Sequence, residues 1–160
     1  MSDREAAYNS AIVFQKRLGD YFMIVAKELG EEKAWEFMQK SMIKDAQESA
    51  EGLKNMLGDT ELTAEMVMNM FVPGNLACGI VSAGEVVDGN VVFTNEQCSM
   101  YDGLVNAGFS HEMVKKYCET HMEYVGKTFY NLVGLKADPV IEKYRNDKDG
   151  TCKETLRITN

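Results

Sequence analysis

The chain has 160 residues, 45% of them apolar, and a formal net charge of −8 at pH 7. This length and composition fit one domain with its own core, so we expect residues 1–160 to form a single domain. The acidic balance disfavours nucleic acid and anionic membranes as partners, because both need a basic surface. No apolar run approaches the roughly 20 residues that span a bilayer. The polar start, Met1 to Glu5, lacks the apolar stretch of a secretory signal, so we expect a cytoplasmic protein.

The first part of the chain, residues 1–72, has the periodicity of helices. Apolar side chains recur at spacings of three and four, and Gly30 and Gly58 mark the ends of the first two periodic runs. A proline and a glycine favour a turn after the third run. The pattern therefore predicts helices over residues 3–29, over about 31–57, and from an N-cap at Thr63 to the turn at Val72-Pro73-Gly74.

The second part, residues 76–160, mixes strands with helices. Two valine- and isoleucine-rich runs flank Asp88-Gly89-Asn90, which is a strong hairpin signal. The expected strands cover residues 76–87, 90–95, 140–145 and 152–158, and the expected helices cover about 99–107 and 111–134. Two hairpins that straddle a helical pair can share one sheet. We therefore predict an α+β fold with a four-stranded, mainly antiparallel sheet covered by the helical pair.

Cysteine and histidine supply the clearest candidates for chemistry. Cys118 and His121 are three residues apart on the apolar stripe of a predicted helix, so their side chains are neighbours on its surface. A nearby imidazolium lowers the pKa of a thiol and makes it a nucleophile near neutral pH. We name Cys118 and His121 as candidate catalytic residues. Packing in the core is the alternative, because free cysteine is often fully buried.

Two further cysteines stand at boundaries between predicted elements. Cys98 follows a strand and Cys152 begins the last one, so a shared sheet can bring both to Cys118. Cys98 joins the catalytic candidates, and the candidate substrate pocket consists of Cys152, Tyr101, Tyr124 and Phe129. A zinc site is the alternative, since Cys98, Cys118, His121 and Cys152 form a complete tetrahedral set. Only Cys118 and His121 have the close spacing usual in such sites. Otherwise no cofactor is expected.

Cys78 and the known nucleotide and hydrolase motifs add little to this picture. Cys78 begins a predicted strand without a histidine or acidic neighbour, so packing is the better interpretation. The sequence contains no GxGxxG, P-loop, G-x-S-x-G, HExxH or CxxC motif. Nucleotide-driven chemistry and a serine-hydrolase mechanism are therefore poor explanations of this chain.

The order of residues in the second half points to a known family. Cys98 follows a strand, a short helix ends at Gly108, Lys116-Tyr117-Cys118-Glu119 lies early in the next helix, and Asp149-Gly150-Thr151-Cys152 precedes the last strand. In this order the stretch from about Val91 to Ile158 resembles the L-2-amino-thiazoline-4-carboxylic acid hydrolase-like family. Its helix and hairpin scheme is also similar to that of vinyl-reductase-like small-molecule-binding domains.

These resemblances imply two functions. The first implies a hydrolase that opens a small cyclic substrate at a C–N bond, with Cys118 as first candidate nucleophile and Cys98 and Cys152 beside it. The second implies, as the alternative, a non-catalytic ligand-binding or sensor domain with a cysteine-ligated zinc. Either way the expected partner is a small molecule. The apolar surface of the long N-terminal helix also predicts a homodimer.

Overall fold

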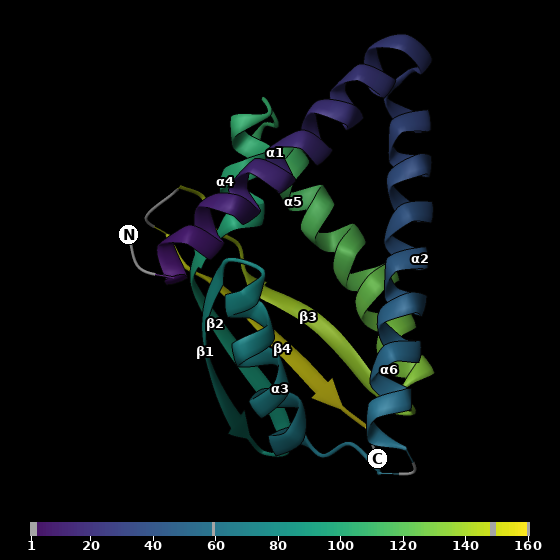
Figure 1. Ribbon diagram of the computed structural model, residues 1–160, viewed down its shortest axis with the longest axis vertical. Helices are drawn as coiled ribbons and strands as arrows, with labels where there is room; N and C mark the ends of the chain where they lie inside the picture. Colours follow the sequence, from purple (N-terminus) through teal and green to yellow (C-terminus); the bar gives the residue numbers. More distant parts are fainter. Residues whose placement is uncertain (1–2, 59, 148–149, 160) are drawn as a thin grey trace.

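The computed structural model describes residues 3–58, 60–147 and 150–159 (Figure 1). Met1, Ser2 and Asp149, named above, lie outside these ranges. In chain order the elements are α1 (Asp3–Leu29), α2 (Glu31–Leu57), α3 (Ala64–Ala77), β1 (Ile80–Val87), β2 (Asn90–Cys98), α4 (Ser99–Asn106), α5 (His111–Thr120), the π-helix η1 (His121–Gly126), α6 (Lys127–Leu132), β3 (Ala137–Lys143) and β4 (Cys152–Ile158). The predicted α+β class is confirmed.

The sheet has the strand order β1-β2-β4-β3, and every neighbouring pair is antiparallel. Asp88 (φ 50°) and Gly89 (φ 77°) form the two-residue turn between β1 and β2. Both residues have the left-handed conformation that such a hairpin turn requires, which explains the signal in the sequence. β2 also pairs with β4, so that Val91 lies opposite Leu156. This pairing joins the two predicted hairpins in one sheet.

One face of the sheet packs against helices. Val91, Phe93 and Leu156 point to this face and form a buried cluster with Val67 of α3 and Tyr130 of α6. α3 covers β1 and β2, whereas η1 and α6 lie against β3 (Figure 1). Because strand side chains alternate between the two faces, every second residue of β2 and β4 shares this helix-covered face. That alternation determines which polar residues lie beneath the helices.

A second core lies between the helices. Phe22 of α1 packs against Trp35 of α2, with ring centroids 4.6 Å apart, and against Phe109 at 5.0 Å. Leu104 of α4 and Tyr117 of α5 complete this buried cluster. α1 and α2 form a long hairpin that extends beyond the sheet (Figure 1). None of the helices in the described ranges combines the length and apolar character needed to cross a bilayer.

The predicted turn at Val72-Pro73-Gly74 is wrong. α3 continues through Pro73 to Ala77, and β1 begins only at Ile80. Proline costs a helix one backbone hydrogen bond, but Pro73 is exposed and the apolar face of α3 packs on the sheet, which outweighs that loss. Cys78 consequently caps the helix and is exposed, so it is not the packed strand residue that we expected.

The predicted helix 111–134 is interrupted by the π-helix η1. A π-turn contains more residues than an α-turn, so residues beyond it are displaced around the helix axis from the positions that an α-helical period predicts. Tyr130 is therefore buried at 7% exposure, while Leu132 is 40% exposed. β3 also ends earlier than predicted, at Lys143, which leaves Tyr144 and Arg145 in the following loop.

Candidate functional site

A small cavity lies at the end of the sheet where β2 ends and β4 begins, beneath α4 and α5. Its volume is about 30 Å³, room for two or three water molecules. Cys98, Cys118 and Cys152 all line it, so the expected convergence of these thiols is observed. The other lining residues are Tyr101, Val114, Lys115, Ile141, Tyr144, Arg145 and Glu154.

The strand pairing explains how the thiols meet. Cys98 is the last residue of β2 and Cys152 is the first of β4, and the register places Cys152 opposite Asn95. Ser99 anchors the junction after Cys98, because its backbone N–H donates to Gly79 O at 3.1 Å. Cys118 reaches the same cavity from α5. Residues distant in sequence thus form one thiol-lined site.

Burial keeps all three thiols neutral at physiological pH. It raises the pKa of Cys152 to about 12, and the negative charge of Glu154 acts in the same direction. Burial also raises the pKa of Cys98, and it raises that of Cys118 well above the ordinary value, with Cys98 and Glu154 adding to the effect. Since the thiolate is the nucleophile, any reaction here needs a base that removes the thiol proton.

Glu154 is the only carboxyl group among the residues that line this cavity. Burial raises its pKa from 4.5 to about 6, although hydrogen bonds from Cys152 and Asn95 oppose the rise. Cys152 Sγ donates to Glu154 Oε1 at 3.7 Å, and Asn95 Nδ2 donates to the same oxygen at 3.0 Å. A carboxyl group that titrates near pH 6 can both accept and return a proton at neutral pH.

Our sequence analysis did not identify Glu154. The signal was present, because residues two apart in a strand share a face, and Cys152 was already a candidate. Arg145 was also missed, and nothing in its loop distinguishes it. Its guanidinium Nη2 donates to the backbone oxygens of Glu96 at 2.5 Å and Asn95 at 3.4 Å, and the group lies 5.7 Å from the centre of the Tyr101 ring. These bonds attach the loop to the end of β2.

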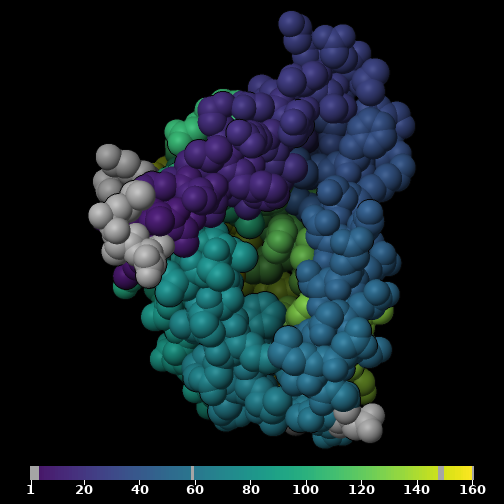
Figure 2. All heavy atoms as spheres, in the orientation of Figure 1, coloured from purple at the N-terminus to yellow at the C-terminus, as the bar shows by residue number. Residues whose placement is uncertain are grey.

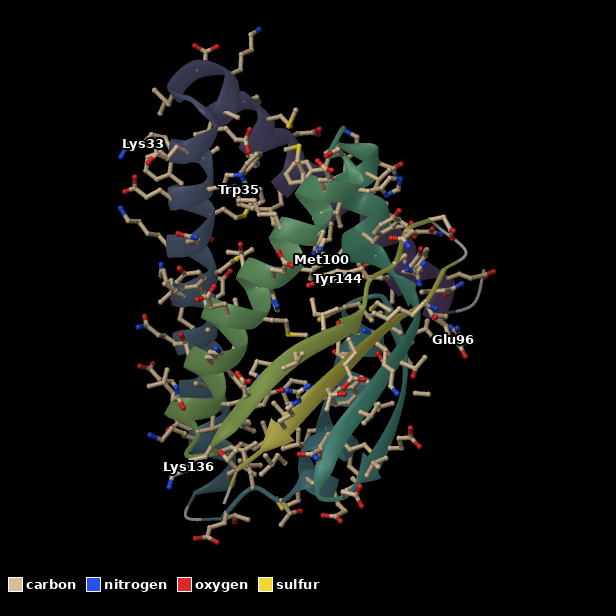
Figure 3. All side chains as sticks on the ribbon, turned by 180° about the vertical axis from the view of Figure 1, so that it is seen from behind. Lys33, Trp35, Glu96, Met100, Lys136 and Tyr144 are labelled. Carbon is tan, nitrogen blue, oxygen red and sulfur yellow. The ribbon has the colours of Figure 1, made fainter. Side chains whose placement is uncertain are left out.

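Tyr144 and Lys115 lie at the outer side of the cavity. Tyr144 OH donates to Glu119 Oε1 at 2.9 Å, and Lys115 Nζ lies 4.9 Å from the centre of the Tyr144 ring. Figure 3 shows Tyr144 between α5 and the end of β3. On the inner side, the Tyr101 hydroxyl is 2.7 Å from His111 Nδ1. The hydroxyls of both tyrosines therefore already have partners.

Three predicted site residues do not line the cavity. The His121 ring stacks on Tyr117, with centroids 6.3 Å apart, and burial lowers its pKa to about 4. It is therefore neutral at pH 7 and cannot act on Cys118 as an imidazolium. Phe129 packs against Phe71, with centroids 5.9 Å apart, in the core beneath the sheet. Tyr124, on η1, is half-buried away from the cavity.

The expected zinc ligands are not assembled as a set. Within the described residues, no group of three or more His, Cys, Asp or Glu side chains is placed to hold a metal ion. Cys98, Cys118 and Cys152 share a cavity, but His121, the fourth expected ligand, lies outside it. A tetrahedral zinc site needs all four ligands at one point, so these residues do not fit the metal and we derive no step through it.

The surface is hollowed on the side of the molecule that carries the helices. Figure 2 shows this hollow between α1, α2 and α3, with α5, η1 and the C-terminal strands visible at its bottom. The helices therefore leave an opening over the helix-covered face of the sheet, the face to which Glu154 and Asn95 belong by strand alternation.

Neither the protein-family models nor the curated proteins compared with this sequence match it.

Proposed function

We propose that this chain is a small-molecule hydrolase, similar to L-2-amino-thiazoline-4-carboxylic acid hydrolases, that opens a small cyclic substrate at a C–N bond. The observation that supports this proposal is the contact of Cys152 with Glu154 in a cavity lined by two more thiols. Sequence analysis favoured Cys118 as nucleophile. Cys152 is the better candidate, because it has a carboxyl group beside it that titrates near neutral pH.

The reaction follows from this pair. The Glu154 carboxylate accepts the proton of the Cys152 thiol, and the thiolate adds to the electrophilic ring carbon. The C–N bond breaks as the leaving nitrogen takes the proton from Glu154. Water then attacks the carbon bound to Cys152, giving one proton to Glu154, and the departing sulfur recovers that proton. The net reaction consumes one water molecule and regenerates both side chains.

Substrate entry requires the cavity to widen. Room for two or three waters does not admit a substituted five-membered ring. Tyr144 and Lys115 are the side chains most able to move. Lys115 is exposed, and it is held by a 3.9 Å ion pair with Glu119 and by its contact with Tyr144. Exposed pairs of this kind contribute less than about 1 kcal/mol.

The test is hydrolysis of L-2-amino-thiazoline-4-carboxylic acid and of a panel of cyclic amidines, followed by product chromatography. We expect Cys152→Ser and Glu154→Gln to lower kcat/KM at least about 100-fold. Cys78→Ser is the control, because Cys78 is exposed and outside the cavity. Cys118→Ser tests which of Cys118 and Cys152 is the nucleophile, because the nucleophile is the one whose replacement abolishes turnover. Full activity of Cys152→Ser contradicts its role, and no turnover of any substrate contradicts the hydrolase.

A non-catalytic ligand-binding or sensor domain is the second candidate. Its supporting observation is that burial holds all three cavity thiols neutral, as suits a binding pocket. Calorimetric binding of the same compounds without turnover would favour this function. For either function we propose a cytoplasmic location, because the four free cysteines stay reduced there.

A further inference from the structure

A row of hydrogen bonds crosses the sheet from α3 to the cavity. Asn75 Nδ2 donates to Ser82 Oγ at 3.0 Å, and Ser82 Oγ donates to Asn95 Oδ1 at 2.5 Å. Asn95 Nδ2 then donates to Glu154 Oε1 at 3.0 Å and to Cys152 Sγ at 3.1 Å. The row joins one helix to three neighbouring strands and ends on the two residues of the proposed reaction.

The row has a fixed direction. A serine hydroxyl has a single proton, and here Ser82 gives that proton to Asn95 while accepting one from Asn75. The carbonyl side of the Asn95 amide must therefore face β1, which leaves its NH₂ group facing β4. Asn95 is 3% exposed, so bulk water cannot replace either partner. A flipped amide would place two oxygens, Asn95 Oδ1 and Glu154 Oε1, against each other.

We propose that Asn95 is a positioning residue, whose NH₂ group holds the Glu154 carboxyl and the Cys152 sulfur together, and that Ser82 fixes the orientation of Asn95. The catalytic meaning of this arrangement rests on the proposed hydrolase function. The arrangement itself can be measured without any substrate. Neither Asn95 nor Ser82 was a candidate from the sequence, since the catalytic and the zinc-site interpretations both concerned cysteine, histidine and aromatic residues.

The Asn95 amide has a measurable effect on Glu154. A buried N–H donor stabilises the ionised carboxyl and so opposes the effect of burial on its pKa. Removal of the Asn95 amide should therefore raise the pKa of Glu154 further. The other titratable or charged groups around Glu154 are Cys98, Tyr101, Lys115, Cys118, Tyr130, Tyr144, Arg145 and Cys152. None of these groups is itself substituted when Ser82 or Asn95 is changed, so a shift of the Glu154 pKa reports on the hydrogen-bonded row.

The experiment is a carbon NMR titration of the full chain labelled in its glutamate carboxyls, with Glu154→Gln to assign the signal. We expect Asn95→Ala to raise the pKa of Glu154 by about one unit and Ser82→Ala to raise it by a smaller amount. Ser82→Thr keeps the hydroxyl and should restore the wild-type value. This rescue separates positioning from a general loss of packing, because threonine is the larger change in volume.

An unchanged Glu154 pKa in folded Ser82→Ala and Asn95→Ala overturns the proposal. If Asn95→Ala does not fold, the Ser82→Ala and Ser82→Thr pair decides alone, because Ser82 is only half-buried. A Ser82→Thr titration that matches Ser82→Ala also overturns it. If the titration behaves as expected while no cyclic substrate is turned over, the hydrolase function fails and the positioning role of Asn95 stands.

Discussion

At the residue scale, Glu154 is a carboxyl group that burial makes unfavourable to ionise. Its carboxyl is enclosed by protein and close to three thiols, and within the described part of the chain it accepts hydrogen bonds from Asn95 and Cys152. A carboxyl group whose pKa is raised by burial destabilises the folded state wherever it is ionised. Such groups cluster at functional sites, which is why Glu154 rather than His121 anchors our proposal.

Glu154→Gln should therefore stabilise the protein at alkaline pH. The pKa of Glu154 is about 6 when folded and 4.5 ordinarily, so the stability from its protonated form is complete below pH 4.5 and is lost as pH rises through 6. Glutamine does not titrate. We expect the variant to gain at most about 2 kcal/mol over wild type at pH 8 and little at pH 4, measured by urea unfolding. The exposed Glu96→Gln is the control, and a less stable Glu154→Gln at pH 8 contradicts this account.

His121 should make the fold sensitive to acid. Burial lowers its pKa from 6.5 to about 4, so the stability of the neutral form is present above pH 6.5 and is lost as pH falls through 4. The loss amounts to about 3 kcal/mol at most. His121→Gln should flatten this dependence of the free energy of unfolding on pH, measured by urea unfolding at pH 7, 5 and 4. An equal acid sensitivity in His121→Gln would show that another group is responsible.

At the element scale, the crossing of α1 and α4 determines where the cavity forms. Gly103 of α4 lies so close to α1 that an added Cβ would be 2.4 Å from Gln15 Cβ and 2.9 Å from the backbone oxygen of Ile12. α4 begins directly after Cys98 and carries Tyr101, two of the cavity residues. The absence of a side chain at position 103 thus allows α1 to hold the inner wall of the cavity in place.

Gly103→Ala should destabilise the fold by about 3 kcal/mol, because a backbone contact cannot yield as a flexible side chain can. Gly52→Ala in α2 is the matched control. Nothing lies within 4 Å of its added Cβ, so alanine there should stabilise the helix by about 0.5–1 kcal/mol. Thermal and urea unfolding measure both changes. A Gly103→Ala protein as stable as wild type would mean that α1 and α4 can separate at little cost.

At the scale of the whole molecule, the helical hairpin leaves much apolar surface uncovered. The stripe predicted on α1 is only partly buried: Phe22 is 3% exposed, whereas Phe14 and Tyr21 are 65% and 67% exposed. The other large apolar side chains exposed on the hairpin are Val13, Met23, Ile24, Leu29, Phe37 and Met56. Many exposed apolar side chains on one pair of helices are typical of interfaces between chains.

We therefore keep the sequence-based prediction of a homodimer and place its interface on α1. Phe14→Glu with Tyr21→Glu should shift sedimentation at micromolar concentration from dimer to monomer with little change in melting temperature, since both side chains are exposed. Val87→Glu, on the distant β1–β2 hairpin, should leave the dimer intact. A wild-type chain that sediments as a monomer at these concentrations would exclude a stable dimer.

Features that depend on local conformation could be predicted from the amino-acid pattern alone. Asp88-Gly89 specifies a hairpin because its two residues favour left-handed backbone angles, and the periodic runs specify most of the helices. The shared sheet, and with it the approach of Cys98, Cys118 and Cys152, followed from the order of elements. The continuation of α3 through Pro73 was missed because packing of that helix on the sheet, not local preference, decides whether the proline is tolerated.

Which residues act together in the cavity depends on the three-dimensional fold. Desolvation and hydrogen bonding depend on neighbours brought from other strands and helices, and no spacing encodes them. Cys152 thus gains Glu154 as a partner through the shared face of β4, and Asn95 joins them through the β2–β4 register. His121 stacks on Tyr117 instead of joining Cys118 in the cavity. The sequence supplied the thiols, and the fold supplied the carboxyl group that can activate one of them.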